Sequence, residues 1–246
     1  MEKLWEAILS ASRVTEDPIK AWDEHNADLQ ARCEYLNKLK IRKLHYTADN
    51  GTDLTVGLIP EGAWRGGGDK DLKGIFFNPN IPTEECFISP MKGKAEGIVY
   101  SSKPLSYQGQ LIENFAIRFE GGKAVEVHAE KNEALLKKMI SMDEGAAYLG
   151  ECAFVPYDSP IRNADILFYN TLFYENAACH MAFGEAYPCL EGGQKMTKEE
   201  LKARGILVRH FTSDRIRNFN RITIGTRAQM DVLLEKTKQI LAEKGC

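Results

Sequence analysis

Apolar residues recur at helical spacing in about the first forty positions of the chain. The pattern predicts a short helix over residues 2–11 and a longer helix that begins at Asp17, since an aspartate can cap a helix and Pro18 suits its first turn. The longer helix carries an apolar stripe formed by Ile19, Trp22, Leu29, Cys33 and Leu36. Such a stripe normally packs against a core or another subunit, so we assign it a structural role.

Alternating apolar and polar positions predict antiparallel strands farther along the chain. Residues 42–48 and 53–59 flank an Asp-Asn-Gly-Thr turn, and residues 111–119 and 123–129 flank a Gly-Gly turn, so both pairs are predicted hairpins. A short strand is expected over residues 151–156. The three consecutive glycines at 66–68 lack the strand-turn-helix context of a phosphate-binding loop and are interpreted as a flexible loop.

Helical patterns return between and after these strands. They predict helices over residues 132–142, 172–186 and 198–204. The last forty or so residues are expected to form two strands and a helix, over residues 206–211, 220–225 and 227–244. The predicted fold class is therefore α+β, with a mixed or antiparallel sheet and flanking helices.

Composition and charge exclude several classes of protein. The 246 residues suffice for one large domain or two small ones, and 43% hydrophobic with 27% charged residues is ordinary for a soluble protein. The net charge of -3 gives no electrostatic case for nucleic acid, and neither a membrane-spanning run nor a signal-peptide pattern is present. Six scattered cysteines without a Cys-x-x-Cys pair indicate neither a zinc knuckle nor a disulfide framework and favour a reducing, cytoplasmic location.

Two adjacent acids, Glu84 and Glu85, follow the Ile-Phe-Phe run and a turn that contains Pro82. One carboxylate could bind a metal ion while the other acts as a general base. Adjacent glutamates are also common on solvated turns, so the pair alone leaves both interpretations open. Glu151 is more informative, because an acid at the head of an apolar strand is costly to bury unless it is paired or bound to a cation.

A third group of candidates lies on or just after the predicted helix over residues 172–186. Glu175 and His180 are five positions apart and do not share a helical face, whereas His180 and Tyr187 are seven apart and do. His180 is a candidate metal ligand, and Tyr187 could donate a hydrogen bond to a developing oxyanion. A lone histidine on an apolar helix is more often a core residue, and His25, His45 and His128 are interpreted as structural.

Taken together, these motifs resemble those of the thermophilic aminopeptidase family, the aminopeptidase T/S type of two-metal peptidase. The resemblance covers about residues 2–204. It implies an enzyme that releases single residues from the N-termini of peptides with two divalent ions such as zinc, cobalt or manganese, and that forms a homodimer. The motifs that carry it include Asn-Ile-Pro-Thr-Glu-Glu-Cys-Phe at 80–87, Asp-Glu-Gly-Ala at 143–146, Leu-Gly-Glu at 149–151, Glu-Asn-Ala-Ala-Cys-His at 175–180 and Ala-Tyr-Pro at 186–188.

The resemblance also implies a role for each candidate. Glu85, Glu151, Glu175 and His180 match metal-site positions of the family, and Tyr187 matches its active-site tyrosine. Glu84 is the adjacent catalytic acid, and its role could be exchanged with that of Glu85. In the family's mechanism the metals lower the pKa of a shared water and polarise the scissile carbonyl.

Two departures from the family pattern stand out. Family members carry an N-terminal domain before the matching segment, so we expect a catalytic domain without it. The family also closes its metal site with a His-x-Asp motif. Here His210 is close in position and is kept as a candidate ligand, but Thr212 stands where the aspartate should be and Asp214 is a poor substitute. We therefore expect impaired or absent activity.

The tail, about residues 201–246, instead resembles the C-terminal end of histidinol-phosphate aminotransferases. In that family Arg221 and Arg209 would hold acidic groups of the substrate, but the lysine and the cofactor domain of such enzymes have no counterpart here. The sequence thus predicts a fusion of an aminopeptidase domain, 1–204, with an aminotransferase-like tail, 205–246. The alternatives are a catalytically dead remnant or binding module and, more weakly, an aminotransferase fragment.

Overall fold

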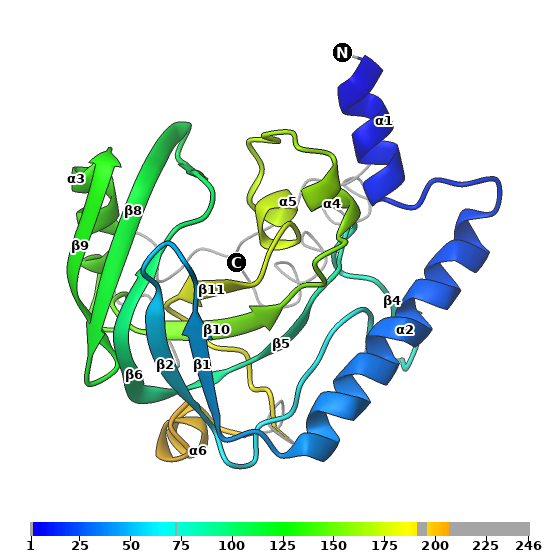
Figure 1. The fold of residues 1–246 in the computed structure, drawn as a ribbon. Coiled ribbons are helices and arrows are strands. Elements are labelled where there is room, and N and C mark those ends of the chain that lie inside the picture. The colour runs from blue at the N-terminus through cyan, green and yellow to red at the C-terminus, as the bar shows by residue number, and fades with distance from the viewer. Residues whose placement is uncertain (1, 72, 191–195, 207–246) are drawn as a thin grey trace, which may run out of the picture. The chain divides into compact units, whose positions relative to one another are not determined.

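The computed structural model describes residues 2–71, 73–190 and 196–206 (Figure 1). The chain divides into two units, Met1–Arg209 and His210–Cys246, and every described residue belongs to the first. His210, Thr212 and Asp214, Arg209 and Arg221, and all of the predicted tail beyond Ile206, lie outside the described residues, so the expectations for them stay predictions. Within the described part, no helix is both long and apolar enough to cross a membrane.

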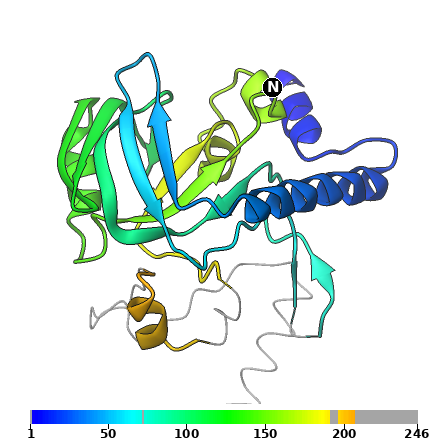
Figure 2. The ribbon, with the colours of Figure 1, turned by 60° about the horizontal axis from the view of Figure 1, so that its bottom comes forward.

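The two N-terminal helices form where the sequence predicts them. Helix α1 spans Glu2–Ala11 and α2 spans Pro18–Leu39, and the Asp17 side chain caps α2 by accepting a hydrogen bond from the Lys20 amide. The predicted stripe of α2 is only partly buried: Leu29 and Cys33 lie in the core, whereas Ile19 is 76% exposed. Helix α1 lies beside the short helix α4, Pro160–Asn163, in both views (Figures 1 and 2).

The larger sheet is wholly antiparallel and contains both predicted hairpins. Its order is β1-β2-β6-β8-β7, and β9 pairs with β8 outside this path. The sequence does not predict strands β6 and β7; β7 is only three residues long, and burial along β6 does not alternate regularly. The strands are β1 Lys43–Thr47, β2 Asp53–Leu58, β6 Pro90–Tyr100, β7 Leu105–Tyr107, β8 Gln110–Glu120 and β9 Lys123–Lys131.

The smaller sheet carries Glu151 and His180, and Glu85 directly precedes one of its strands. It has three antiparallel strands in the order β11-β10-β5, namely His180–Phe183, Leu149–Phe154 and Cys86–Ile88. A separate pair joins β3, Asp69–Lys70, to β4, Phe76–Phe77. Buried residues of the larger and the smaller sheet belong to one core, so these two sheets pack together.

The helix predicted over residues 172–186 is wrong. Only Thr171–Glu175 is helical, as the short helix α5, and the chain then extends into β11. Pairing of β11 with β10 supplies backbone hydrogen bonds along His180–Phe183, and this tertiary contact outweighs the local helical pattern. His180 and Tyr187 consequently do not share a helical face.

The helices predicted over residues 132–142 and 198–204 form, and each is slightly shorter than predicted. Helix α3, Glu133–Ile140, packs on β9 and β8, and α6, Lys198–Ala203, begins with a capping box between Thr197 and Glu200. The confirmed fold class is α+β, with helices around antiparallel sheets.

The triple-glycine segment follows Arg65, which forms an isolated bridge beside the smaller sheet. The backbone of Arg65 bridges Phe87 of β5, and a Cβ on Gly66 would lie 2.4 Å from the Glu85 carbonyl oxygen. Only glycine allows this approach of two backbones. Gly66 therefore packs closely against the backbone that leads into β5.

Candidate metal centre

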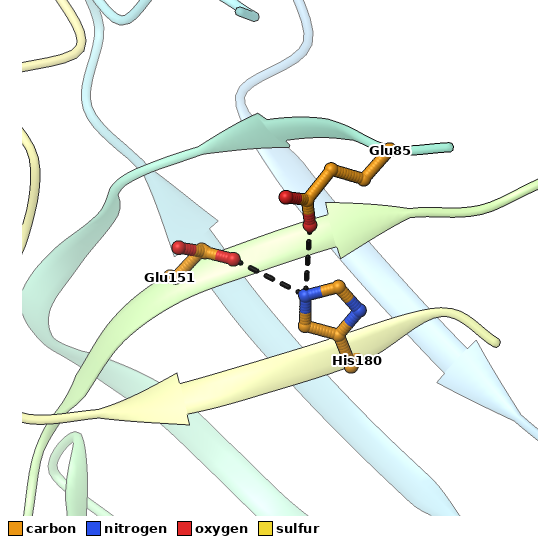
Figure 3. Close-up of side chains that lie close together, drawn as sticks. All are labelled: Glu85, Glu151 and His180. Atoms are coloured by element: carbon orange, nitrogen blue, oxygen red, sulfur yellow. Dashed lines mark hydrogen bonds and ion pairs between the residues drawn. The ribbon is translucent and has the colours of Figure 1, made fainter. Parts of the chain in front are cut away.

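Strand register places three candidate ligands on one face of the smaller sheet. His180 and Phe87 each pair with Ala153 of β10, from opposite sides. Paired residues share a face, and so do residues two positions apart in one extended segment. Glu151 precedes Ala153 by two positions, and Glu85 precedes Phe87 by two. The side chains of Glu85, Glu151 and His180 therefore converge, as Figure 3 shows.

The geometry of this cluster suits a cation. His180 Nε2 lies 3.0 Å from Glu85 Oε2 and 3.2 Å from Glu151 Oε1, and one donor atom from each residue lies within 4.8 Å of the others. The other ring nitrogen, Nδ1, lies 3.1 Å from the Ala178 carbonyl oxygen. A hydrogen bond from Nδ1–H to this carbonyl would orient the ring and leave Nε2 free to ligate a metal.

The cluster holds more negative charge than one imidazole can neutralise. Burial acts to lower the pKa of His180, but its contacts with Glu151 and Glu85 outweigh burial and raise the pKa to about 10. The pKa of Glu175 is raised to about 7, chiefly by burial. The positive charge of His180 lowers this pKa, and the negative charges of Glu85 and Glu151 raise it. Carboxylates crowded in this way are stabilised by a bound cation.

One oxygen of the cluster lacks a hydrogen bond. Glu85 Oε2 is buried and has only its ion-pair contact with His180, since a single Nε2–H serves one acceptor and Glu151 takes it. An imidazole nitrogen with carboxylate oxygens is a donor set typical of zinc and related divalent ions. The residues present therefore fit a divalent metal ion.

Glu84 has different partners from Glu85. Its carboxylate is buried and forms an ion pair with Arg13, with Nη1 2.6 Å from Oε1 and Nη2 donating to Oε2 at 3.0 Å. The Glu84 amide donates to Asn176 Oδ1 at 2.6 Å. The structure thus brings Glu84 to Arg13 and leaves it outside the Glu85–Glu151–His180 cluster; its role as a general base stays a prediction.

Glu175 and Tyr187 lie near the cluster, one from the end of a helix and one from a loop. Glu175 ends α5, and Tyr187 follows β11, with its ring centroid 5.5 Å from that of Phe87. Burial raises the pKa of Tyr187, and the charges of Glu151, Glu175 and Glu85 raise it further. Both residues line a cavity of about 590 Å³ together with Glu85 and Glu151. A cavity of this size can admit a small ligand.

Comparison with known proteins identifies the family. The chain matches the thermophilic metalloprotease (M29) family over residues 1–217. It belongs to this family. It is 49% identical over 205 residues to aminopeptidase AmpS of Bacillus subtilis, a match that covers 82% of this chain and 50% of AmpS. The structure of wild-type AmpT from Thermus thermophilus superposes with a TM-score of 0.76 and 45% identity, over 85% of this chain and 50% of AmpT.

This M29 chain spans about half the length of the curated relatives that it matches. The predicted resemblance to the thermophilic aminopeptidases is confirmed. The predicted second resemblance is also found: 48 residues are 56% identical to a histidinol-phosphate aminotransferase of Clostridium beijerinckii, a match that covers 20% of this chain and 13% of that enzyme.

Three residues support the M29 site from outside the metal cluster: His25, which the sequence predicts to be structural, and Arg13 and Asn176, which the sequence does not single out. His25 Nε2 lies 2.7 Å from the Thr83 carbonyl oxygen, Arg13 pairs with Glu84, and the fully buried Asn176 accepts from the Glu84 amide. Together they fix the segment that presents Glu85. No local pattern marks them, because Arg13 is 71 positions from Glu84 and His25 is 58 from Thr83.

Proposed function

We propose that this chain is a metal-dependent hydrolase of the aminopeptidase kind, which holds a divalent ion at Glu85, Glu151 and His180. The observation that carries the proposal is the convergence of these three donors on one sheet face. Membership of the M29 family and relatives that are named aminopeptidases support the reaction class. When bound, the ion would supply a Lewis acid that polarises a carbonyl and lowers the pKa of water.

The chain's own residues have distinct tasks in this proposal. Glu175 adds a carboxylate beside the three ligands, and the acidic cavity attracts the free ammonium group of a peptide. Tyr187, at the cavity wall, donates a hydrogen bond to the oxygen on which negative charge develops. The proposed substrates are therefore peptides with a free N-terminus.

We further propose that metal loading is incomplete. The described residues supply one cluster of three donors with Glu175 nearby, and the His-x-Asp motif that the family uses to close the site reads His210-Phe-Thr212 here. A threonine lacks the carboxylate of an aspartate, so a second ion loses a ligand. This substitution is the observation that favours the alternative, a binding module without catalysis.

Hydrolysis of a leucine anilide by the purified full chain tests the activity. We expect slow turnover that requires added zinc, cobalt or manganese and disappears in Glu151→Gln. Glu126→Gln is the matched control, because Glu126 is an exposed acid that pairs with Arg118 on the larger sheet. Turnover that survives Glu151→Gln would contradict the proposed site, and metal binding without any turnover would favour the binding module.

The predicted role of Glu84 is tested in the same assay. If Glu84 is the general base, Glu84→Gln lowers kcat while KM and zinc affinity stay unchanged. If it only holds the segment through Arg13, the substitution lowers stability and metal affinity together.

A further inference from the structure

Arg65 lies on the same sheet face as the metal cluster. Its amide donates to the Phe87 carbonyl at 2.9 Å, and the Phe87 amide donates to the Arg65 carbonyl at 2.7 Å. Arg65 and Phe87 are therefore directly opposed in an antiparallel bridge, and their side chains share a face. Glu85 is two positions before Phe87, which makes it the diagonal neighbour of Arg65 on that face.

Within the described residues, Arg65 is the one lysine or arginine that lines the 590 Å³ cavity, whose other charged residues are Asp69, Glu85, Glu151 and Glu175. The described cavity lining thus carries one arginine and four acids. A ligand with an ammonium group at one end and an acidic group at the other would match this arrangement of charge.

The guanidinium of Arg65 is poorly satisfied within the protein. Among the described residues no carboxylate lies within ion-pair distance of Arg65, and its one side-chain hydrogen bond is a long one, from Nη2 to the Leu190 carbonyl at 3.4 Å. Its Nε is buried without a hydrogen-bond partner. A buried donor without a partner is costly, and the planar fork of arginine matches a carboxylate with two parallel hydrogen bonds.

We propose that Arg65 binds the C-terminal carboxylate of a short peptide whose ammonium group lies at the acidic cluster. The inference rests on the proposed function and names its substrate class, di- and tripeptides with a free C-terminus. Diagonal neighbours across antiparallel strands are about 7–8 Å apart. Two extended residues span up to about 7 Å, so the two ends of a dipeptide are separated by a similar distance.

The test compares binding of leucyl-leucine with binding of its C-terminal amide, measured by calorimetry on the full chain without metal, so that no turnover occurs. A hydrogen-bonded charge pair predicts that wild type binds the acid about 10- to 100-fold more tightly than the amide. We expect Arg65→Gln to remove this preference and Arg65→Lys, which keeps the charge without the fork, to reduce it. Arg118→Gln, on the exposed face of the larger sheet, should retain it.

Two results would overturn the inference. One is a wild-type chain that binds acid and amide equally. The other is an Arg65→Gln chain that weakens both ligands by the same factor, because Arg65 would then contact a group common to both, such as the peptide carbonyl. The binding assay is independent of catalysis, so a chain that never hydrolyses peptides but loses its preference in Arg65→Gln supports this inference and contradicts only the proposed activity.

Discussion

Glu84 and Glu85 are neighbours in the chain, yet their carboxylates have different partners. Glu85 contacts His180 in the metal cluster, whereas Glu84 forms a buried ion pair with Arg13. The alternation of an extended segment produces this division, since successive side chains point to opposite sides. Each acid is thus stabilised by a different cation. Arg13 binds Glu84 and so helps to hold the neighbouring metal ligand, Glu85, which it does not contact.

The Arg13–Glu84 pair makes a prediction about stability. Arg13→Ala leaves Glu84, whose side chain is 4% exposed, without its cation, and such a loss typically costs about 3–5 kcal/mol. Urea unfolding of Arg13→Ala and Arg118→Ala provides the comparison, because the Arg118–Glu126 pair is exposed and should contribute about 1 kcal/mol or less. Equal decreases in the free energy of unfolding of the two variants would show that the buried pair stabilises the fold no more than the exposed pair does.

The shifted pKa of His25 predicts how the stability of the fold depends on pH. Burial lowers its pKa below 6.5; nearby Arg13 lowers it further, while the hydrogen bond to Thr83 and the charges of Glu84 and Asp28 oppose the shift. Around pH 6.5 the unfolded chain therefore binds protons at His25 more readily than the folded chain does, so the free energy of unfolding falls as the pH drops through 6.5. Between pH 7.5 and pH 5.5, wild type should lose more stability than His25→Gln. An identical loss in both would exclude His25 as the cause.

At the scale of elements, the site depends on the backbone of residues 65–66, which lies beside strand β5 of the three-stranded sheet. The Gly66 region approaches β5 so closely that a Cβ would meet the Glu85 carbonyl oxygen. The same segment carries Arg65 into the cavity with Glu85. The glycines thus allow the proposed carboxylate-binding residue and a metal ligand to lie on one face.

Gly66→Ala should therefore disturb both folding and metal binding, because the clash is with backbone that no rotamer change can relieve. Gly74→Ala is the contrast: that position has open space around it but a φ of +81°, so we expect only a strain of about 1–2 kcal/mol. Thermal unfolding and zinc titration of both variants make the comparison. A Gly66→Ala chain with normal zinc affinity would mean that the close approach does not position Glu85.

The elements that the sequence predicts correctly are those with local signals. Both hairpins have alternating strands and glycine-containing turns, and α2 has its Asp17 cap. The region after Thr171 carries a helical pattern, but the chain leaves the helix after Glu175 and extends into β11, which depends on pairing with β10. The metal ligands are predicted from residue type and resemblance, but their convergence depends on strand register, which periodicity alone does not give.

At the scale of the whole molecule, the chain combines two resemblances of unequal extent. The M29 match covers residues 1–217, and the aminotransferase match covers 48 residues. The division predicted at residues 204–205 and the closing ligand His210 remain predictions. The chain is an M29 protein, but because Thr212 replaces the expected aspartate we expect its metal site to be incomplete.

Calorimetric titration of the metal-free full chain with zinc tests this central claim most directly. We expect about one ion per chain with modest affinity, and loss of that binding in Glu151→Gln and Glu85→Gln but not in the control Glu126→Gln, because the described ligands form one cluster. Two tight sites per chain, or one site that persists when Glu85 and Glu151 are both substituted, would contradict the account.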